Sequence, residues 1–294
     1  MYDLINTKKL DVRRIATVII ILIISIVIIN FFIIKSRKKM ENKLNQNNIL
    51  QVACQGIIFE DDEEDLTEKI KIFNGFSEEQ IKIIENIYKD TGEKRVFLTF
   101  DDGPSKAVTP HILDILKKEK VKATFFVLGN NVEINQDLIK RAFQEGHYIA
   151  NHGYSHVYSN IYKSKETVFD EYNKTEKAIQ VALDNNDYHS NLFRFPGGSS
   201  GGKYNKLKQE AIEEFKKNNI TYLDWNALSN DSAGAKTKEE LMENIIKTVG
   251  EKKSVVILMH DAGDKISTYE TLPEIIKYLR EKGYKFQNIY DILE

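Results

Sequence analysis

Cysteine is almost absent from this chain, and so is any excess of charge. Cys54 is the one cysteine among 294 residues, which excludes an intrachain disulfide. The formal net charge of −2 argues against nucleic acid as a partner, because binding to phosphates needs an excess of Lys and Arg. No glycine-rich phosphate loop follows the first predicted strand, which removes the main reason to expect a nucleotide-binding sheet.

Charge is also missing from residues 15–34, which are mostly Ile and Val. A helix of about 20 residues, rising 1.5 Å per residue, spans a hydrocarbon core of roughly 30 Å. A cleaved signal peptide has a shorter apolar region that ends in small residues, whereas this run ends in Phe and Ile at 31–34. We therefore expect an uncleaved membrane anchor. Basic residues lie on both sides of it, so charge does not give its orientation.

Apolar residues at spacings of three and four predict a helix over residues 77–89, and Ser77 with Gln80 predicts a capping box at its start. The acidic run at 60–65 is typical of a solvated segment. The predicted segments are a short basic tail (1–14), the anchor (15–34), a stalk that ends in a packing helix (35–92) and a larger domain (93–294).

The larger domain alternates between short apolar runs and amphipathic stretches, which predicts a parallel sheet with helices outside it. About seven such repeats fit an α/β fold of the (β/α) barrel type, small and incomplete; a doubly wound open sheet is the alternative. The predicted strands are 96–100, 123–128, 148–151, 192–195, 220–224, 255–259 and 285–289. The predicted helices are 108–118, 136–145, 166–183, 207–217, 238–249 and 272–282.

Polar residues that could act in catalysis follow several of the predicted strands. In a barrel of parallel strands, reactive groups gather at the carboxyl ends, so residues far apart in sequence would meet at one rim. Each one alone could be a capping or turn residue, but their common position favours an active site. They are Asp101 and Asp102 after the first strand, His152 after the third, Arg194 in the fourth, Asp224 and Trp225 at the fifth and His260 at the sixth.

Three of these side chains fit a catalytic metal site. His152 and His156 are four residues apart, a spacing that lets both imidazoles reach one ion from a helical turn or a compact loop. A carboxylate would complete a site with three protein ligands and an open position for water, and we assign Asp102 to it. This ligand set favours one divalent ion, zinc first, although cobalt, nickel or manganese could also bind.

Asp101 and His260 are the candidate base and acid of a hydrolysis. Successive side chains of an extended segment face opposite ways, so Asp101 would point away from its neighbour Asp102 and could take a proton from the attacking water. His260 could protonate a leaving nitrogen. Arg194 could hold Asp101 ionised through a charge-assisted pair, and Asp231 could orient His260 and raise its pKa.

With these residues identified, the chain from about Arg95 onward resembles the polysaccharide deacetylases, carbohydrate esterase family 4, and in particular the membrane-anchored peptidoglycan N-acetylglucosamine deacetylases. The resemblance implies a distorted (β/α) barrel that hydrolyses the N-acetyl group of a sugar and releases acetate. It implies the same roles for the base, the acid, the metal ligands and Arg194. The motifs that carry it are residues 99–103, 152–156, 194–197 and 257–260.

Two motifs depart from the family pattern. Gly197 stands where the family usually has an aromatic residue; the resemblance implies that its backbone N–H still supports the oxyanion, without an aromatic wall. The usual Asp-Trp pair is here Asp231 followed by Ser232. Further candidate substrate contacts, each of which could equally pack in the core, are Trp225 and Leu258 at the acetyl pocket and Tyr154 and Tyr158 on sugar rings.

The anchor and the resemblance together predict a single-pass membrane protein with an extracytoplasmic, metal-dependent deacetylase domain. Its expected partner is a glycan polymer, with neither nucleic acid nor a protein partner. The leading substrate is N-acetylglucosamine of peptidoglycan, whose deacetylation would reduce lysozyme cleavage. Muramic acid, chitin-like oligomers or an exported polysaccharide are the alternatives, and a glycan-binding protein without catalysis is the alternative outside enzymes.

Overall fold

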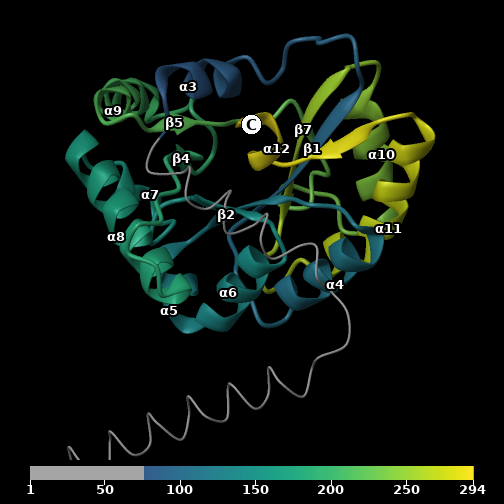
Figure 1. The fold of residues 1–294 in the computed structure, drawn as a ribbon, viewed down its shortest axis with the longest axis horizontal. Helices are drawn as coiled ribbons and strands as arrows, with labels where there is room; N and C mark the ends of the chain where they lie inside the picture. The colour runs from purple at the N-terminus through teal and green to yellow at the C-terminus, as the bar shows by residue number, and fades with distance from the viewer. Residues whose placement is uncertain (1–75, 294) are drawn as a thin grey trace, which may run out of the picture. The chain divides into compact units, whose positions relative to one another are not determined.

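The computed structural model describes residues 76–293 (Figure 1). The predicted tail (1–14), the anchor (15–34) and most of the predicted stalk lie outside these residues. Between residues 76 and 293, no helix has both the length and the apolar character that crossing a membrane requires. The structure therefore covers the predicted larger domain and the helix that precedes it.

A curled parallel sheet forms the centre of the domain. Seven strands follow the order β5-β4-β3-β2-β1-β7-β6, an eighth strand, β8, pairs with β1, and all pairings are parallel. Because no pairing among the described strands joins β5 to β6, the sheet is a half-barrel, consistent with the predicted distorted (β/α) barrel. The strands are Arg95–Asp101 (β1), Thr124–Val127 (β2), Tyr148–Asn151 (β3), Leu192–Phe193 (β4), Thr221–Tyr222 (β5), Ala227–Leu228 (β6), Ser254–His260 (β7) and Lys285–Gln287 (β8).

Helices connect most successive strands and surround the sheet (Figure 1). Three of them begin with a capping box, in which the N-cap side chain and the third helical residue exchange hydrogen bonds with the backbone. The helices are Glu78–Glu85 (α3), Thr109–Glu119 (α4), Gly129–Ile134 (α5), Gln136–Gln144 (α6), Tyr158–Ile161 (α7), Lys165–Leu183 (α8), Asn205–Lys217 (α9), Lys238–Val249 (α10), Ile266–Glu281 (α11) and Tyr290–Leu293 (α12).

Each predicted strand and helix of the domain is present, with differences at the ends. The sequence does not predict β6, because a strand of two residues is too short to show a period. Helix α11 begins at Ile266, ahead of the predicted start at 272, and includes Pro273; proline is usual only in the first turn, so the sequence favours a later start. The capping box at Ser77 and Gln80 is confirmed.

Strand β1 is buried on both faces, and its two faces serve different purposes. Val96, Leu98 and Phe100 belong to the core cluster that the outer helices cover. Phe97 belongs to a second cluster, inside the half-barrel. Ile84 of α3 packs in the same cluster. Side chains alternate along a strand, so the inward face continues from Phe97 to polar residues at the carboxyl end. Because Ile84 lies in the same cluster as Phe97, α3 packs on the domain, as the sequence predicts for residues 77–89.

The register of β1 brings two candidate residues side by side. Strand β7 pairs with β1 along its whole length, and Asp101 lies opposite His260 at the carboxyl end. On its other edge, β1 pairs with β2 near Asp101 and with β8 near Arg95. The end of β1 is therefore held between two strands at the point where the polar residues begin.

Candidate active site

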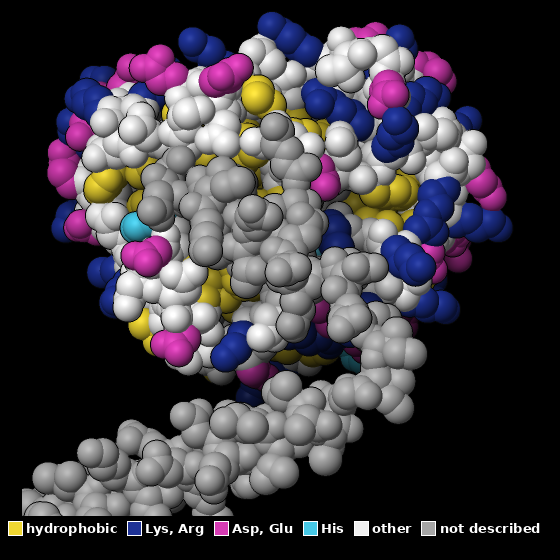
Figure 2. Space-filling model, in the orientation of Figure 1, with side chains coloured by type: hydrophobic (Ala, Val, Ile, Leu, Met, Phe, Trp, Pro, Cys, Tyr) yellow, Lys and Arg dark blue, Asp and Glu magenta, His cyan; other side chains and the backbone are white. Residues whose placement is uncertain are grey.

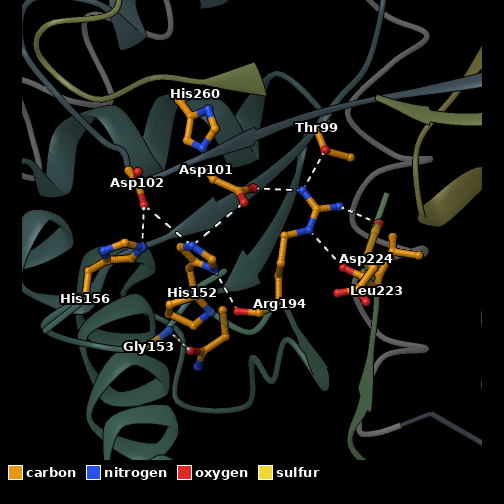
Figure 3. Close-up of polar contacts among 12 residues, drawn as sticks. Thr99, Asp101, Asp102, His152, Gly153, His156, Arg194, Leu223, Asp224 and His260 are labelled. Carbon is orange, nitrogen blue, oxygen red and sulfur yellow. Dashed lines mark hydrogen bonds and ion pairs between the residues drawn. The ribbon is translucent and has the colours of Figure 1, made fainter. Parts of the chain in front are cut away.

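The candidate site lies where the carboxyl ends of β1, β3, β4 and β7 meet. Figure 3 shows side chains that converge there from elements far apart in the chain. The structure brings together the predicted metal ligands, base, acid and their supporting residues, which are Asp101, Asp102, His152, His156, Arg194, Asp231 and His260.

Asp102 faces the two histidines of the predicted metal site. Its Oδ1 lies 3.5 Å from Nε2 of His152 and 3.4 Å from Nε2 of His156. The three residues each offer one ligand atom, and these atoms lie within 4.8 Å of one another. Oδ1 of Asp102 is buried and has no hydrogen-bond partner in the described part of the chain. A buried anionic oxygen without a donor is costly, so a divalent ion between these atoms fits the residues that are present.

A hydrogen bond of Nδ1 fixes the tautomer of neutral His152. Nδ1 lies 2.7 Å from the backbone oxygen of Arg194, and because a carbonyl can only accept, Nδ1 carries the proton. The lone pair is therefore on Nε2, which points toward Asp102 (Figure 3). Burial lowers the pKa of His152 to about 3, against the opposing charge of Asp102. A neutral imidazole oriented by a carbonyl is the form in which histidine binds metals.

The loop between the two histidines is held by a residue that the sequence does not identify. The Glu171 carboxylate on α8 accepts hydrogen bonds from the backbone N–H of Tyr154 (2.8 Å) and of Ser155 (2.7 Å), and from the Ser155 hydroxyl (2.8 Å). At the end of the loop His156 adopts a positive φ of 55°, a conformation that is uncommon outside glycine and needs support. Glu171 therefore helps to set the separation of the two imidazoles.

Asp101 pairs with Arg194 in the interior of the half-barrel. Nη1 of Arg194 donates to Oδ1 of Asp101 over 2.8 Å and to the Thr99 hydroxyl over 2.7 Å. Its other groups donate to the backbone oxygens of Leu223 and Asp224. Both charged side chains are almost inaccessible, and removing one partner of such a pair typically costs about 3–5 kcal/mol. The predicted pair between Arg194 and Asp101 is therefore present, and it fixes the direction of the carboxylate.

The environment of Asp101 suits a general base. Burial raises the pKa of its carboxyl group, and the positive charges of Arg194 and His260 oppose that rise. Its second oxygen, Oδ2, lies 3.8 Å from Nε2 of His152, on the side of the metal ligands. One oxygen is therefore held by arginine while the other faces the place where an ion and a water molecule would lie.

His260 is held by Asp231, as the sequence predicts. Nδ1 of His260 lies 2.8 Å from Oδ1 of Asp231, and the backbone N–H of His260 donates to Oδ2. The Thr268 hydroxyl on α11 also donates to Oδ2, over 2.7 Å. Burial would lower the pKa of His260, but the hydrogen bond and charge of Asp231 outweigh it, with Asp101 adding to the effect, and raise that pKa to about 9. The imidazole is therefore protonated at neutral pH and available as an acid.

The loop that follows Arg194 is shaped by glycine and by Asp224. Gly197 has φ of 75°, a conformation that glycine adopts without strain. The Asp224 carboxylate does not enter the site; it accepts hydrogen bonds from the backbone N–H and the hydroxyl of Ser199. Trp225 lies beside Gly198, where an added Cβ would be 3.3 Å from its ring, and Leu258 is almost fully buried in β7. Asp224 therefore supports the Gly197 loop.

Tyr154 points toward α5 and α8. Its hydroxyl donates to Glu133 over 2.9 Å, its ring lies against Gly129, and the Lys174 amine lies 5.9 Å from the ring centre. These contacts place the side chain in a surface groove between the two helices. The stacking of Tyr154 on a sugar ring stays a prediction; the contacts that the structure shows are those of packing, the alternative that the sequence leaves open.

Asp261, which follows His260 at the end of β7, is a further buried carboxyl, and the sequence assigns it no role. It accepts a hydrogen bond of 2.6 Å from the Thr109 hydroxyl, and a Cβ on Gly103 would overlap its carboxylate. Burial raises its pKa to about 7, and the charges of Asp102 and Asp101 add to the rise. Asp261 therefore packs directly behind the turn that carries the metal-facing carboxylate.

Comparison with known proteins places the domain among polysaccharide deacetylases. Residues 88–221 match the family described as polysaccharide deacetylase. The peptidoglycan-N-acetylglucosamine deacetylase PgdA of Listeria monocytogenes is 32% identical over 213 residues, which is 71% of this chain but 41% of that protein. The match therefore spans less than half of the Listeria protein.

Two further comparisons cover more of the related chain. A peptidoglycan-N-acetylglucosamine deacetylase of Bacillus cereus is 32% identical over 205 residues, which is 68% of this chain and 89% of that protein. The structure of a Streptococcus mutans CE4 esterase superposes with a TM-score of 0.63 at 30% identity, over 73% of this chain and 91% of that one. The structural match agrees with the half-barrel fold.

Proposed function

This chain belongs to the polysaccharide deacetylase family, and from that premise we propose that it hydrolyses the N-acetyl group of a sugar in a cell-wall glycan and releases acetate. N-acetylglucosamine of peptidoglycan is the proposed substrate, because relatives from Listeria monocytogenes and Bacillus cereus bear that activity in their names. Muramic acid, chitin-like oligomers and an exported polysaccharide are the alternatives that the test below separates.

The observation that carries the proposal is the separation of three tasks at one rim. Asp102 faces His152 and His156. Asp101 is held by its own arginine, and His260 is held by its own carboxylate. Amide hydrolysis needs an electrophile such as a metal ion, a base for water and an acid for the leaving nitrogen. The rim offers one set of ligands for the ion and a separate side chain for each proton transfer.

A divalent ion held by Asp102, His152 and His156, zinc by the preference of these ligands, would polarise the acetyl carbonyl and make a water molecule more acidic. Asp101 accepts a proton from the attacking water, whose oxygen forms the new bond to the acetyl carbon. The backbone N–H of Gly197 is the proposed donor to the negative charge that develops on the carbonyl oxygen.

His260 completes the reaction. When the carbon–nitrogen bond breaks, the electron pair goes to the sugar nitrogen, and His260 donates a proton to it. Acetate and a free amine are the products. The roles require Asp101 to be ionised and His260 to be protonated, which is the state that Arg194 and Asp231 favour through their charges.

The proposed location follows from the sequence of residues 15–34. An uncharged run of that length suits a membrane anchor, and a glycan outside the membrane is a substrate that an anchored domain could reach. Deacetylated peptidoglycan would then resist lysozyme, because fewer acetylated sugars remain for cleavage. This part of the proposal rests on residues outside the described range.

The test is acetate release by the full-length chain from purified peptidoglycan, from chitin oligomers and from an acetylated exported polysaccharide. Asp101→Asn serves as the blank, since it keeps the shape of the side chain and removes the base. We expect release from peptidoglycan that the blank lacks, with mass spectrometry of the muropeptides locating the loss on N-acetylglucosamine. Loss from muramic acid, or release from chitin alone, would replace the substrate; no release from any of these glycans would contradict the proposed activity.

A further inference from the structure

Tyr158, the first residue of α7, lies at the mouth of the site between His156 and Gly197. Its ring meets the imidazole of His156 edge-on, with 5.5 Å between the ring centres. A Cβ placed on Gly197 would lie 2.7 Å from the Tyr158 hydroxyl oxygen, closer than real atoms approach. The absence of a side chain at 197 therefore makes room for the tyrosine hydroxyl directly over the Gly197 backbone.

Two hydrogen-bond donors without protein partners in residues 76–293 belong to these neighbouring residues. Within residues 76–293, neither the Tyr158 hydroxyl nor the Gly197 N–H makes a hydrogen bond to the protein, whereas the next N–H, that of Gly198, donates to the backbone oxygen of Phe195 over 2.7 Å. Gly197 is exposed, and Tyr158 is 40% exposed. Both donors are therefore open to a ligand that enters from solvent beside the metal-facing histidine.

A purely structural role explains the ring of Tyr158 but not its hydroxyl. The ring packs edge-on against Tyr162 at 5.7 Å and lies 6.4 Å from Tyr204, so it closes an aromatic cluster. The hydroxyl that supports the neighbouring loop is that of Tyr162, which donates to the backbone oxygen of Pro196 over 2.7 Å. Packing alone would be served equally well by phenylalanine at 158.

We propose that Tyr158 contacts the substrate: its hydroxyl donates a hydrogen bond to the carbonyl oxygen of the acetamido group, beside the Gly197 N–H, and its ring forms one wall of the acetyl pocket. This inference rests on the proposed deacetylase function. A phenol hydroxyl is a donor at neutral pH, and a second donor beside a backbone N–H stabilises negative charge on an oxygen better than one alone.

The test compares full-length Tyr158→Phe with the wild type in acetate release from peptidoglycan, with Tyr204→Phe as the matched control. Tyr204 belongs to the same cluster, and its hydroxyl also has no protein partner within residues 76–293. We expect Tyr158→Phe to lower kcat/KM about tenfold, mostly through kcat, because the bond strengthens as charge develops. Tyr204→Phe should match the wild type, and the affinity of Tyr158→Phe for added zinc should not change.

The possible results distinguish a failure of this inference from a failure of the proposed deacetylase function. If the wild type releases acetate and Tyr158→Phe keeps its kcat/KM, the hydroxyl does not contact the substrate and the inference is wrong. If Tyr158→Phe loses zinc affinity in proportion to its activity, the tyrosine supports His156 instead, and the inference is also wrong. If the wild type itself is inactive on every acetylated glycan, the proposed function fails and this inference fails with it.

Discussion

At the scale of single residues, the proposed metal site depends on where three polar atoms point. Asp102 directly follows β1 and has a positive φ of 74°, a conformation that aspartate tolerates better than most residues. The chain turns there, so Asp101 faces Arg194 while the next carboxylate faces the histidines (Figure 3). The two adjacent side chains therefore face different groups, as predicted, but the cause is the left-handed turn at Asp102 rather than the alternation of an extended segment.

His156→Ala removes one of the three proposed ligands. His156 is partly exposed, so its loss should leave the fold intact while zinc affinity and acetate release fall below detection. Titration of zinc into the chelator-treated protein measures the first, and circular dichroism checks the fold. His111→Ala, which removes an exposed histidine on α4, is the matched control. Wild-type zinc affinity in His156→Ala would show that the ligand set is wrong.

The pH profile tests the acid and the base. Activity should fall at low pH as Asp101 takes up a proton, and at high pH as His260 loses one near its pKa of about 9. Asp231→Asn removes the negative charge that raises the pKa of His260, so the alkaline limb of kcat/KM should move to lower pH by more than about one unit. Asp264→Asn, an exposed neighbour, should leave that limb in place. An unchanged limb in Asp231→Asn would remove His260 from the role of acid.

The residues that lie in compact motifs could be predicted from the sequence, because each motif puts its side chain at a strand end. Glu171 and Thr268 could not be, since each sits on a helix and reaches the site only through the packing of that helix on the sheet. Tyr154 lies within a recognisable motif, yet its side chain contacts Glu133 on α5. Position in a motif predicts proximity to a site, whereas direction depends on the backbone.

At the scale of elements, α8 supports the loop between the two proposed histidine ligands of the metal. Glu171 is 8% exposed and accepts all three hydrogen bonds that the 154–155 segment directs toward α8. A second buried carboxylate on the same helix, Glu176, accepts from Asn151 and from Ser190. The helix therefore anchors both the end of β3 and the loop that follows it.

Glu171→Gln tests this support. The amide can accept fewer hydrogen bonds than the carboxylate and carries no charge, so the loop should loosen. Loss of such outer contacts typically lowers metal affinity by about 10–100-fold, and we expect that loss in zinc titrations, with acetate release restored by excess zinc. Glu274→Gln on the exposed face of α11 is the control. Equal zinc affinity in both variants would show that α8 does not position the ligands.

The sequence predicts best the strands and helices that have a long apolar run or a clear hydrophobic period. Strands β1 and β7 are buried along almost their whole length, and such apolar runs stand out between polar helices. Strands β4 and β5, which the sequence predicts as longer runs, and β6, which it does not predict, span two residues each. Their ends are decided by pairing with neighbouring strands. Helix α7, which carries Tyr158, has four residues and leaves no periodic signal.

At the scale of the whole molecule, the half-barrel gathers polar residues at one rim while its surface carries both signs of charge. On the face shown in Figure 2, Lys and Arg are interspersed with Asp and Glu, as a net charge of −2 leads one to expect. The parallel topology could be predicted from the alternation of strands and helices. The sequence also predicts an incomplete barrel, but not that its open edge lies between β5 and β6, because strand pairing around a barrel depends on contacts between distant segments.

The proposed anchor belongs to this scale. The full-length chain should sediment with membranes and be released by detergent, and a variant lacking residues 1–36 should remain in the supernatant with its acetate release intact. The physical reason is the transfer of a long uncharged helix into hydrocarbon. Fractionation followed by an activity assay measures both properties. A truncated protein that still sediments with membranes would show that residues 15–34 are not the main anchor.

The most direct test of the central claim is acetate release from peptidoglycan by chelator-treated full-length protein during stepwise return of zinc. The account predicts no release before zinc is added, a rise that saturates at about one equivalent because three ligands hold one ion, and no rise in Asp101→Asn although that variant still binds zinc. Full release without any metal, or equal release by Asp101→Asn, would contradict it.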